Sequence, residues 1–223
     1  MLTPSSNRDS RKVVARILLE TRSISVRARN PYVLTSGRHS PVYVDCRRLI
    51  SFPEARRVII NLAAEQIDRY MGSFHFDVIA GGETAGIPYA SWIADRLHKP
   101  MIYIRKKAKE FGCMSRIEGI LSPGQNVLLV EDLATDGQSK FDFVDAIHQA
   151  GGHCSHLFVV FFYDIFPETR RLFLEKNLHM HDLCTWADVL ETAEQDQLLP
   201  SQTLQDVRRF VKDPLGWTPT VPA

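Results

Sequence analysis

The sequence predicts an α/β fold in which helices flank a central, mostly parallel sheet. Short apolar runs typical of buried strands alternate with segments whose apolar residues recur at helical spacing. Such alternation is typical of parallel strands joined by right-handed helical crossovers. Glycine, basic and acidic residues follow three of the apolar runs, at 81–86, 105–109 and 131–132. Because ligands bind outside the carboxyl ends of the strands in such sheets, these segments should gather at one binding edge.

The first elements along the chain are a helix, a turn-rich region and a second helix. Apolar residues over 8–23 recur at helical spacing. Between 31 and 48, Val33, Tyr43 and Val44 flank a turn-forming segment, which predicts a hairpin or a pair of short strands. Pro53 is suited to the first turn of the helix predicted over 53–70.

The rest of the chain alternates between strands and helices. Strands are predicted at 76–80, 101–104, 126–130, 156–162 and 178–183, and helices at 87–97, 139–150, 167–176, 187–195 and 201–211. The segment from 105 to 119 is charged and longer than most connections. Long loops at the binding edge of a sheet are often lids, so a mobile cover is expected here.

Composition narrows the class of protein. The chain has 223 residues, enough for one α/β domain with a full core or for a core with a small appendage. Its net charge of +1 gives no basic field for nucleic acid, and no apolar run is long enough to span a bilayer. The first ten residues lack the apolar segment of a signal peptide, and the four cysteines lie far apart. We therefore expect a cytoplasmic protein with reduced thiols.

The most informative segment is NVLLVEDLATDGQS at 126–139, where a buried strand leads into two adjacent acids and then a loop before a helix. Free backbone N–H groups and the helix dipole at such a loop favour an anion, typically a phosphate. Glu131 and Asp132 would then hold ribose hydroxyls near a divalent cation, while Thr135, Gly137 and Ser139 wrap a 5-phosphate. In the alternative interpretation, Asp132 only caps the following helix.

Three further segments each have a functional and a plain interpretation. The glycine-bearing loop at 81–86 either cradles a pyrophosphate or is an ordinary strand-to-helix turn. The basic run at 105–109 either matches a pyrophosphate leaving group or is a solvated surface. In the segment 35–45, Arg38 and Tyr43 either contact a flat substrate or belong to a hairpin that covers the core.

Together these segments resemble the type I phosphoribosyltransferases, and specifically the orotate phosphoribosyltransferases. The segment VEDLATDGQS at 130–139 resembles the phosphoribosyl diphosphate signature of the superfamily. Three other segments narrow the resemblance and occur in family order: the hairpin SGRHSPVYVD at 36–45, the pyrophosphate-side loop AGGETAGIP at 80–88, and the mobile loop YIRKKAKEFG at 103–112 with IEG at 117–119.

The resemblance implies transfer of phosphoribosyl from phosphoribosyl diphosphate to orotate, giving orotidine 5′-monophosphate and pyrophosphate in UMP biosynthesis. It implies Mg²⁺, held mainly by the diphosphate substrate, with its protein ligands unknown. It also implies a homodimer that exchanges mobile loops, and a single domain over 1–223 to which residues 1–50 contribute an N-terminal hood containing the hairpin. A transferase for another base and a non-catalytic sensor of phosphoribosyl diphosphate remain as alternatives.

The resemblance also assigns the site residues. Lys109 and Asp132 are the expected catalytic residues. The residues expected to bind the diphosphate are Arg105, Lys106, Lys109, Thr84 and Ala85. Those expected to bind the ribose 5-phosphate are Glu131, Asp132, Leu133, Ala134, Thr135, Asp136, Gly137, Gln138 and Ser139. Those expected to line the orotate side are Ser36, Gly37 and Tyr43.

Several positions depart from the family pattern. Phe111 stands where many members have a histidine in the mobile loop, and Thr35 and Ala85 stand where some have lysine. Some members also carry an arginine near the position of Ile165. In the phosphate loop, Asp136 and Gln138 replace small residues, and we expect the Asp136 carboxylate to turn away from the phosphate because like charges repel.

Overall fold

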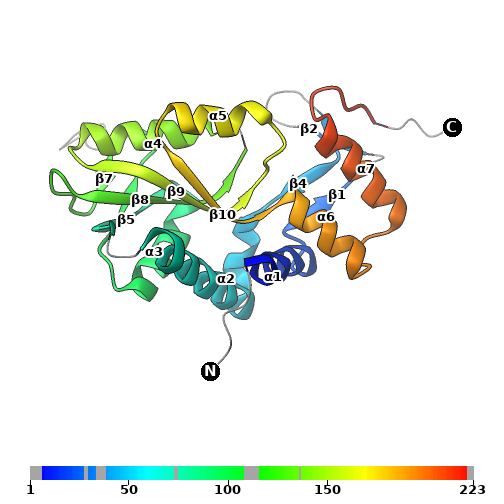
Figure 1. The fold of residues 1–223 in the computed structure, drawn as a ribbon, viewed down its shortest axis with the longest axis horizontal. Coiled ribbons are helices and arrows are strands. Elements are labelled where there is room, and N and C mark those ends of the chain that lie inside the picture. The colour runs from blue at the N-terminus through cyan, green and yellow to red at the C-terminus, as the bar shows by residue number, and fades with distance from the viewer. Residues whose placement is uncertain are drawn as a thin grey trace.

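The computed structural model describes residues 7–27, 30–33, 39–72, 75–107, 116–135 and 137–219. Figure 1 shows helices on both sides of a twisted sheet, with a smaller set of strands and helices at one end. The strands are β1 (Ile24–Val26), β2 (Tyr32–Val33), β3 (His39–Ser40), β4 (Val42–Val44), β5 (Val78–Gly82), β6 (Met101–Ile104), β7 (Ile117–Glu118), β8 (Asn126–Ala134), β9 (His153–Phe162) and β10 (His179–Thr185). The helices are α1 (Asn7–Glu20), η1 (Cys46–Ser51), α2 (Pro53–Gln66), η2 (Ile67–Met71), α3 (Gly86–Leu97), α4 (Gln138–Gln149), α5 (Pro167–Glu175), α6 (Trp186–Gln195) and α7 (Ser201–Lys212).

The central sheet has six strands in the order β10-β9-β8-β5-β6-β7. The pairs from β10 to β6 are all parallel, and only β7 runs antiparallel, beside β6. The carboxyl ends of β5, β6 and β8 therefore lie at one edge of the sheet. The predicted α/β class with a mostly parallel sheet is confirmed.

Alternate residues of the central strands point to opposite faces, and each face has its own core. Leu128 and Val130 pack in a cluster with α1, α2 and α3, whereas Val127 and Leu129 pack in a cluster with α4. This explains why β8 reads as a continuous apolar run, since both of its faces are covered. Figure 1 shows α4 and α5 on one side of the sheet and α2 and α3 on the other.

Two small antiparallel sheets form a hood at the end of the main sheet. β1 pairs with β4, with Ser25 opposite Tyr43, and β2 pairs with β3, with Tyr32 opposite Ser40. Short antiparallel strands are thus present in the turn-rich segment, as predicted, but Val33 pairs with His39, whereas Tyr43 and Val44 belong to β4 and pair with β1. Strand β1 was not predicted, because it has only three residues and its register depends on pairing with β4 rather than on local pattern.

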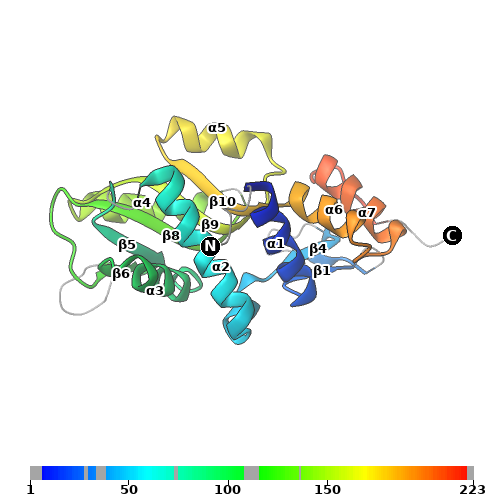
Figure 2. The same cartoon turned by 60° about the horizontal axis from the view of Figure 1, so that its bottom comes forward.

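The N-terminal and C-terminal parts of the chain pack against each other. Figure 2 shows α1 between α2 and α6, and α1 contacts both helices. The Arg11 guanidinium on α1 forms ion pairs with Asp182 of β10 and Asp188 of α6. Asp188 also completes a capping box with Thr185 at the start of α6. This network helps to place α6 and α7 beside the hood.

Most predicted elements are present, with shifts of a few residues at their ends. The largest difference is β8, which continues beyond the acids to Ala134, where β9 still pairs with it. The charged segment after β6 is not wholly a loop, because β7 forms within it. The last turn of the second predicted helix is the π-helix η2. In the described part of the chain, no helix has the length and apolarity needed to cross a bilayer.

Candidate active site

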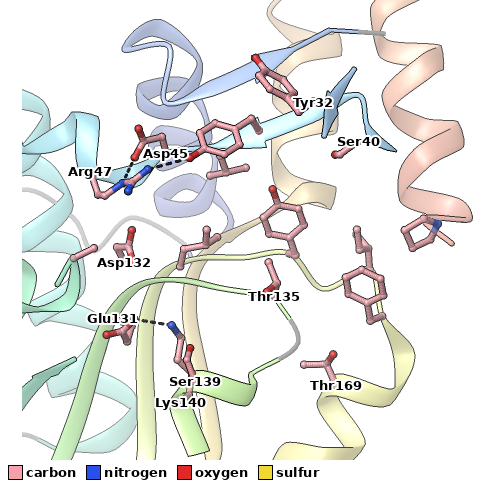
Figure 3. A pocket seen from close by; sticks show the side chains of 18 of the residues that line it. Tyr32, Ser40, Asp45, Arg47, Glu131, Asp132, Thr135, Ser139, Lys140 and Thr169 are labelled. Atoms are coloured by element: carbon pink, nitrogen blue, oxygen red, sulfur yellow. Dashed lines mark hydrogen bonds and ion pairs between the residues drawn. The ribbon is translucent and has the colours of Figure 1, made fainter. Parts of the chain in front are cut away.

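A cavity of about 1130 Å³ opens between the hood and the carboxyl edge of the sheet. Its walls come from the hood, the loop after β5, the residue Lys106 after β6, the end of β8, the start of α4 and the segment from Tyr163 to Leu172. Phe210, Pro214 and Leu215 near the C-terminus complete the wall. Figure 3 shows the acids of β8 below Asp45 and Arg47 of the hood. The three segments predicted to meet at one edge therefore do contribute to one cavity.

Glu131 is a buried carboxylate at the base of this cavity. Its Oε2 accepts a hydrogen bond from Lys140 Nζ at 2.6 Å, while Oε1 is buried without a hydrogen-bond partner among the described residues. A Cβ added at Gly82, the last residue of β5, would lie 1.9 Å from that Oε1, so glycine allows the end of β5 to lie this close to the Glu131 side chain. The glycine loop and the acidic strand, which the sequence placed at one edge, are thus in direct contact.

The two acids differ in their surroundings. Burial raises the pKa of Glu131 to about 7, and the Lys140 ammonium opposes this rise. Burial also raises the pKa of Asp132, and Lys140 opposes that rise as well. Asp132 lines the cavity and is less buried than Glu131. Asp132 therefore offers a carboxylate to a ligand, whereas Glu131 is already engaged on one oxygen.

The loop between β8 and α4 has the form of an anion site. Thr135 and Ser139 line the cavity, and α4 begins at Gln138 with Gly137 as its N-cap. Leu133 also lines the cavity, whereas Ala134 is buried and its carbonyl accepts the N–H of Tyr163. Asp136 lies outside the described residues, and the structure describes the backbone of Gln138 but not its side chain. The expected orientation of Asp136 remains a prediction.

Gly137 is required at its position for two separate reasons, which makes it a sharp test of the loop. Its φ of +83° is a left-handed conformation, and an added Cβ would lie 2.6 Å from the Phe173 ring. Gly137→Ala is expected to lower the free energy of unfolding by about 2–4 kcal/mol, from backbone strain plus overpacking. Gly124→Ala is the matched control, because Gly124 has a φ of +82° and nothing within 4 Å of an added Cβ. Equal losses in urea denaturation for both variants would show that the Phe173 contact relaxes freely.

The diphosphate side of the site is described in part. Thr84, Ala85 and Lys106 line the cavity, and the Lys106 backbone N–H donates to Glu83 Oε2 at 2.7 Å. The peptide bond between Glu83 and Thr84 is cis. Arg105 is not among the lining residues; its Nη1 lies 3.5 Å from Glu118 Oε1. Lys109 and Phe111 lie outside the described residues, so their roles remain predictions.

On the hood side, the structure places Tyr43 in the cavity wall, and its contact with orotate stays a prediction. The Tyr43 ring lies 5.3 Å from the ring of Tyr32, which sequence reasoning had not singled out. Arg47 donates from Nε to Asp45 Oδ1 at 2.6 Å and from Nη2 to the Tyr43 hydroxyl at 3.0 Å. Ser36 and Gly37 lie outside the described residues.

Sequence reasoning missed three kinds of lining residue. Lys140 directly follows the acidic motif at 126–139, so extending the motif by one residue would have included it. Arg47 has no local pattern that separates it from its neighbour Arg48, and only the docking of the hood shows its place. Phe210 and Leu215 come from the far end of the chain and carry no local signal at all.

Comparison with known proteins places this geometry in context. Residues 52–176 match the family described as phosphoribosyl transferase domain. An orotate phosphoribosyltransferase of Ruegeria sp. (strain TM1040) is 47% identical to this chain over 219 residues, covering 97% of each protein. The crystal structure of orotate phosphoribosyltransferase from Aeropyrum pernix has a TM-score of 0.70 at 27% identity, over 82% of this chain and 98% of that one. The Mycobacterium tuberculosis H37Rv orotate phosphoribosyltransferase in complex with 5-phospho-alpha-D-ribosyl 1-diphosphate has a TM-score of 0.62 at 26% identity, over 81% of this chain and 98% of that one.

Proposed function

The chain belongs to the orotate phosphoribosyltransferases of the phosphoribosyltransferase family, and from this premise we propose how its cavity performs the reaction. Enzymes of this kind act in pyrimidine biosynthesis and join orotate to phosphoribosyl diphosphate, giving orotidine 5′-monophosphate and pyrophosphate. The observation that carries the proposal is one cavity bounded by the two acids of β8, the phosphate loop and the hood.

The ribose and its 5-phosphate occupy the end of β8 and the start of α4. Asp132, with its carboxylate in the cavity wall, accepts hydrogen bonds from the ribose hydroxyls. Glu131, the residue before it, is buried at the base of the cavity and helps to hold Asp132 in place. Thr135 and Ser139, together with backbone N–H groups around Gly137, hold the 5-phosphate at the helix N-terminus. Leu133 and Ala134 end β8 and Gln138 begins α4, so they flank the same phosphate loop; Ala134 is buried and contributes only through its backbone, and the role of Asp136 stays a prediction.

The diphosphate lies against the loop after β5 and the basic segment after β6. Displacement at the anomeric carbon develops positive charge on the ribose and negative charge on the leaving pyrophosphate. Lys106 and Lys109 stabilise the leaving group, with Arg105 joining them when the segment closes, while Asp132 stabilises the ring. Closure also excludes water, which otherwise hydrolyses the activated ribose.

The carboxylate oxygens at the end of β8 fit Mg²⁺, which prefers oxygen ligands. Asp132 and the unpartnered Oε1 of Glu131 offer such oxygens, whereas no cluster of three ligating side chains that could hold a metal occurs within the described residues. We therefore assign most of the ligands to the substrate phosphates and hydroxyls, with Asp132 as the protein contact. When bound, the ion neutralises charge on the diphosphate.

The assembly and location are parts of the same proposal. One core cluster joins side chains from α1 to α7, which supports a single domain over 1–223 with residues 1–50 in the hood. We propose a homodimer in which the mobile loop of one subunit closes over the site of its partner. The described cysteines Cys46, Cys154 and Cys184 are free and buried, which fits the reducing cytoplasm.

One assay tests the function directly. Purified protein is mixed with Mg²⁺, phosphoribosyl diphosphate and orotate, and the loss of orotate absorbance is followed. Turnover with orotate supports the proposal. Turnover with another base alone would contradict the assignment of the base, and binding of phosphoribosyl diphosphate without any turnover would point to a sensor.

A further inference from the structure

The substrate orotate carries its own negative charge, and the wall of the cavity must accommodate it. Its C6 carboxylate is adjacent to N1, the atom that bonds to the ribose. The carboxylate must therefore sit beside the ribose, close to Asp132 and under the hood. Asp45 and Asp132 both line this part of the cavity, so an anion there is repelled unless a cation faces it. The wall needs a positive group at the junction of hood and ribose site.

Three lysines and arginines line the cavity among the described residues: Arg47, Lys106 and Lys140. Lys140 is buried and bonded to Glu131 at the base of the site. Lys106 follows β6 on the diphosphate side, and its backbone is fixed to Glu83. Arg47 alone of these three comes from the hood, and Figure 3 shows it beside Asp45 and above Asp132.

The Arg47 guanidinium is hydrogen-bonded along one edge, and its other edge has N–H groups free to bind a ligand. Its Nε donates to Asp45 and its Nη2 donates to the Tyr43 hydroxyl, which fixes the plane of the group. Those two bonds leave Nη1 and the second hydrogen of Nη2 for another acceptor, and 55% of the side chain is exposed. A planar fork of this kind matches a carboxylate in a bidentate pair.

We propose that Arg47 binds the C6 carboxylate of orotate and so selects orotate over bases that lack this group. Asp45 and Tyr43 are positioning residues that aim the guanidinium. The inference rests on the proposed function.

The test compares two nucleotides that differ only in the carboxylate. Orotidine 5′-monophosphate carries it at C6, and uridine 5′-monophosphate has hydrogen there. We expect the wild-type protein to bind orotidine 5′-monophosphate roughly 10- to 100-fold more tightly, as measured by calorimetry. Arg47→Gln should bring this ratio close to one while leaving the affinity for uridine 5′-monophosphate within about twofold. Arg47→Lys should give an intermediate ratio, because it keeps the charge but loses the fork.

The controls separate this inference from its rivals. Arg57→Gln removes the same charge from an exposed arginine of α2 that pairs with Glu54, and should preserve the ratio. If Arg47→Gln weakens both nucleotides equally, Arg47 only braces the hood, and the proposal fails. It also fails if Arg38→Gln, rather than Arg47→Gln, removes the preference. A wild-type protein that shows no orotate turnover would instead count against the proposed function itself.

Discussion

Lys109→Ala is expected to reduce the turnover number by about 10²- to 10³-fold, while orotate affinity changes far less. The reason is that negative charge on the pyrophosphate develops mainly in the transition state, so a lysine directed at it stabilises that state more than bound substrate. The measurement is steady-state kinetics with both substrates varied, together with direct binding of orotidine 5′-monophosphate. Lys107→Ala, one exposed residue of the same basic run, provides the comparison. A loss confined to the Michaelis constant for phosphoribosyl diphosphate would mean that Lys109 binds the ground state only.

The same variant tests whether loops act across a dimer. Lys109→Ala is mixed with Asp132→Asn under conditions that allow subunits to exchange. If each loop serves the partner's site, half of the sites in a mixed dimer join an intact loop to an intact acid. Random mixing then restores roughly a quarter of the wild-type activity. Activity that stays at the sum of the two variants would place each loop over its own site.

The fold was largely predictable because the local composition and residue spacing of most strands and helices indicate their type. The apolar runs of β5, β8 and β9 are buried on both faces, so their composition alone marks them as strands of a covered sheet. The short strands β1 and β7 were not predictable. Each has two or three residues, and each forms only because a partner strand lies beside it.

The residues of the site also divide into those that local sequence indicates and those that only the packing of distant segments brings in. Residues within one strand-loop, such as Asp132, Thr135 and Ser139, are found by reading along the chain, because a single turn brings them together. Arg47 and Leu215 reach the cavity only through the packing of the hood and the C-terminal helices, and no spacing along the chain reports that packing. Lys140 is an intermediate case: it adjoins the motif, but its ion pair becomes visible only because α4 turns it back onto β8.

The ion pair between Lys140 and Glu131 is expected to have a large effect on stability. Lys140→Met is expected to lower the free energy of unfolding by about 3 kcal/mol at mildly alkaline pH, where ionised Glu131 would be a buried carboxylate without a partner. Lys140 opposes the rise in the pKa of Glu131, so its loss should move that pKa further above about 7. At pH 7 Glu131 is then protonated in the variant, and the affinity of the variant for phosphoribosyl diphosphate should be lower than that of the wild-type protein. Raising the pH ionises Glu131 and should restore this affinity. Lys176→Met, at an exposed lysine after α5, is the control.

The sign of the pH dependence makes the effect distinguishable from a simple packing defect. A carboxyl group whose pKa is raised by folding holds a proton that the unfolded chain has released, so stability falls as the pH rises between the two values. For the wild-type protein this window runs from 4.5, the ordinary value, to about 7, and for Lys140→Met it extends to higher pH. The stability deficit of the variant should therefore be small near pH 5 and largest above pH 7. Adding Glu131→Gln to Lys140→Met removes the unpaired charge and should recover much of the loss at high pH. A deficit that is the same at every pH, or a double variant no more stable than the single one, would show that the ammonium contributes packing rather than charge.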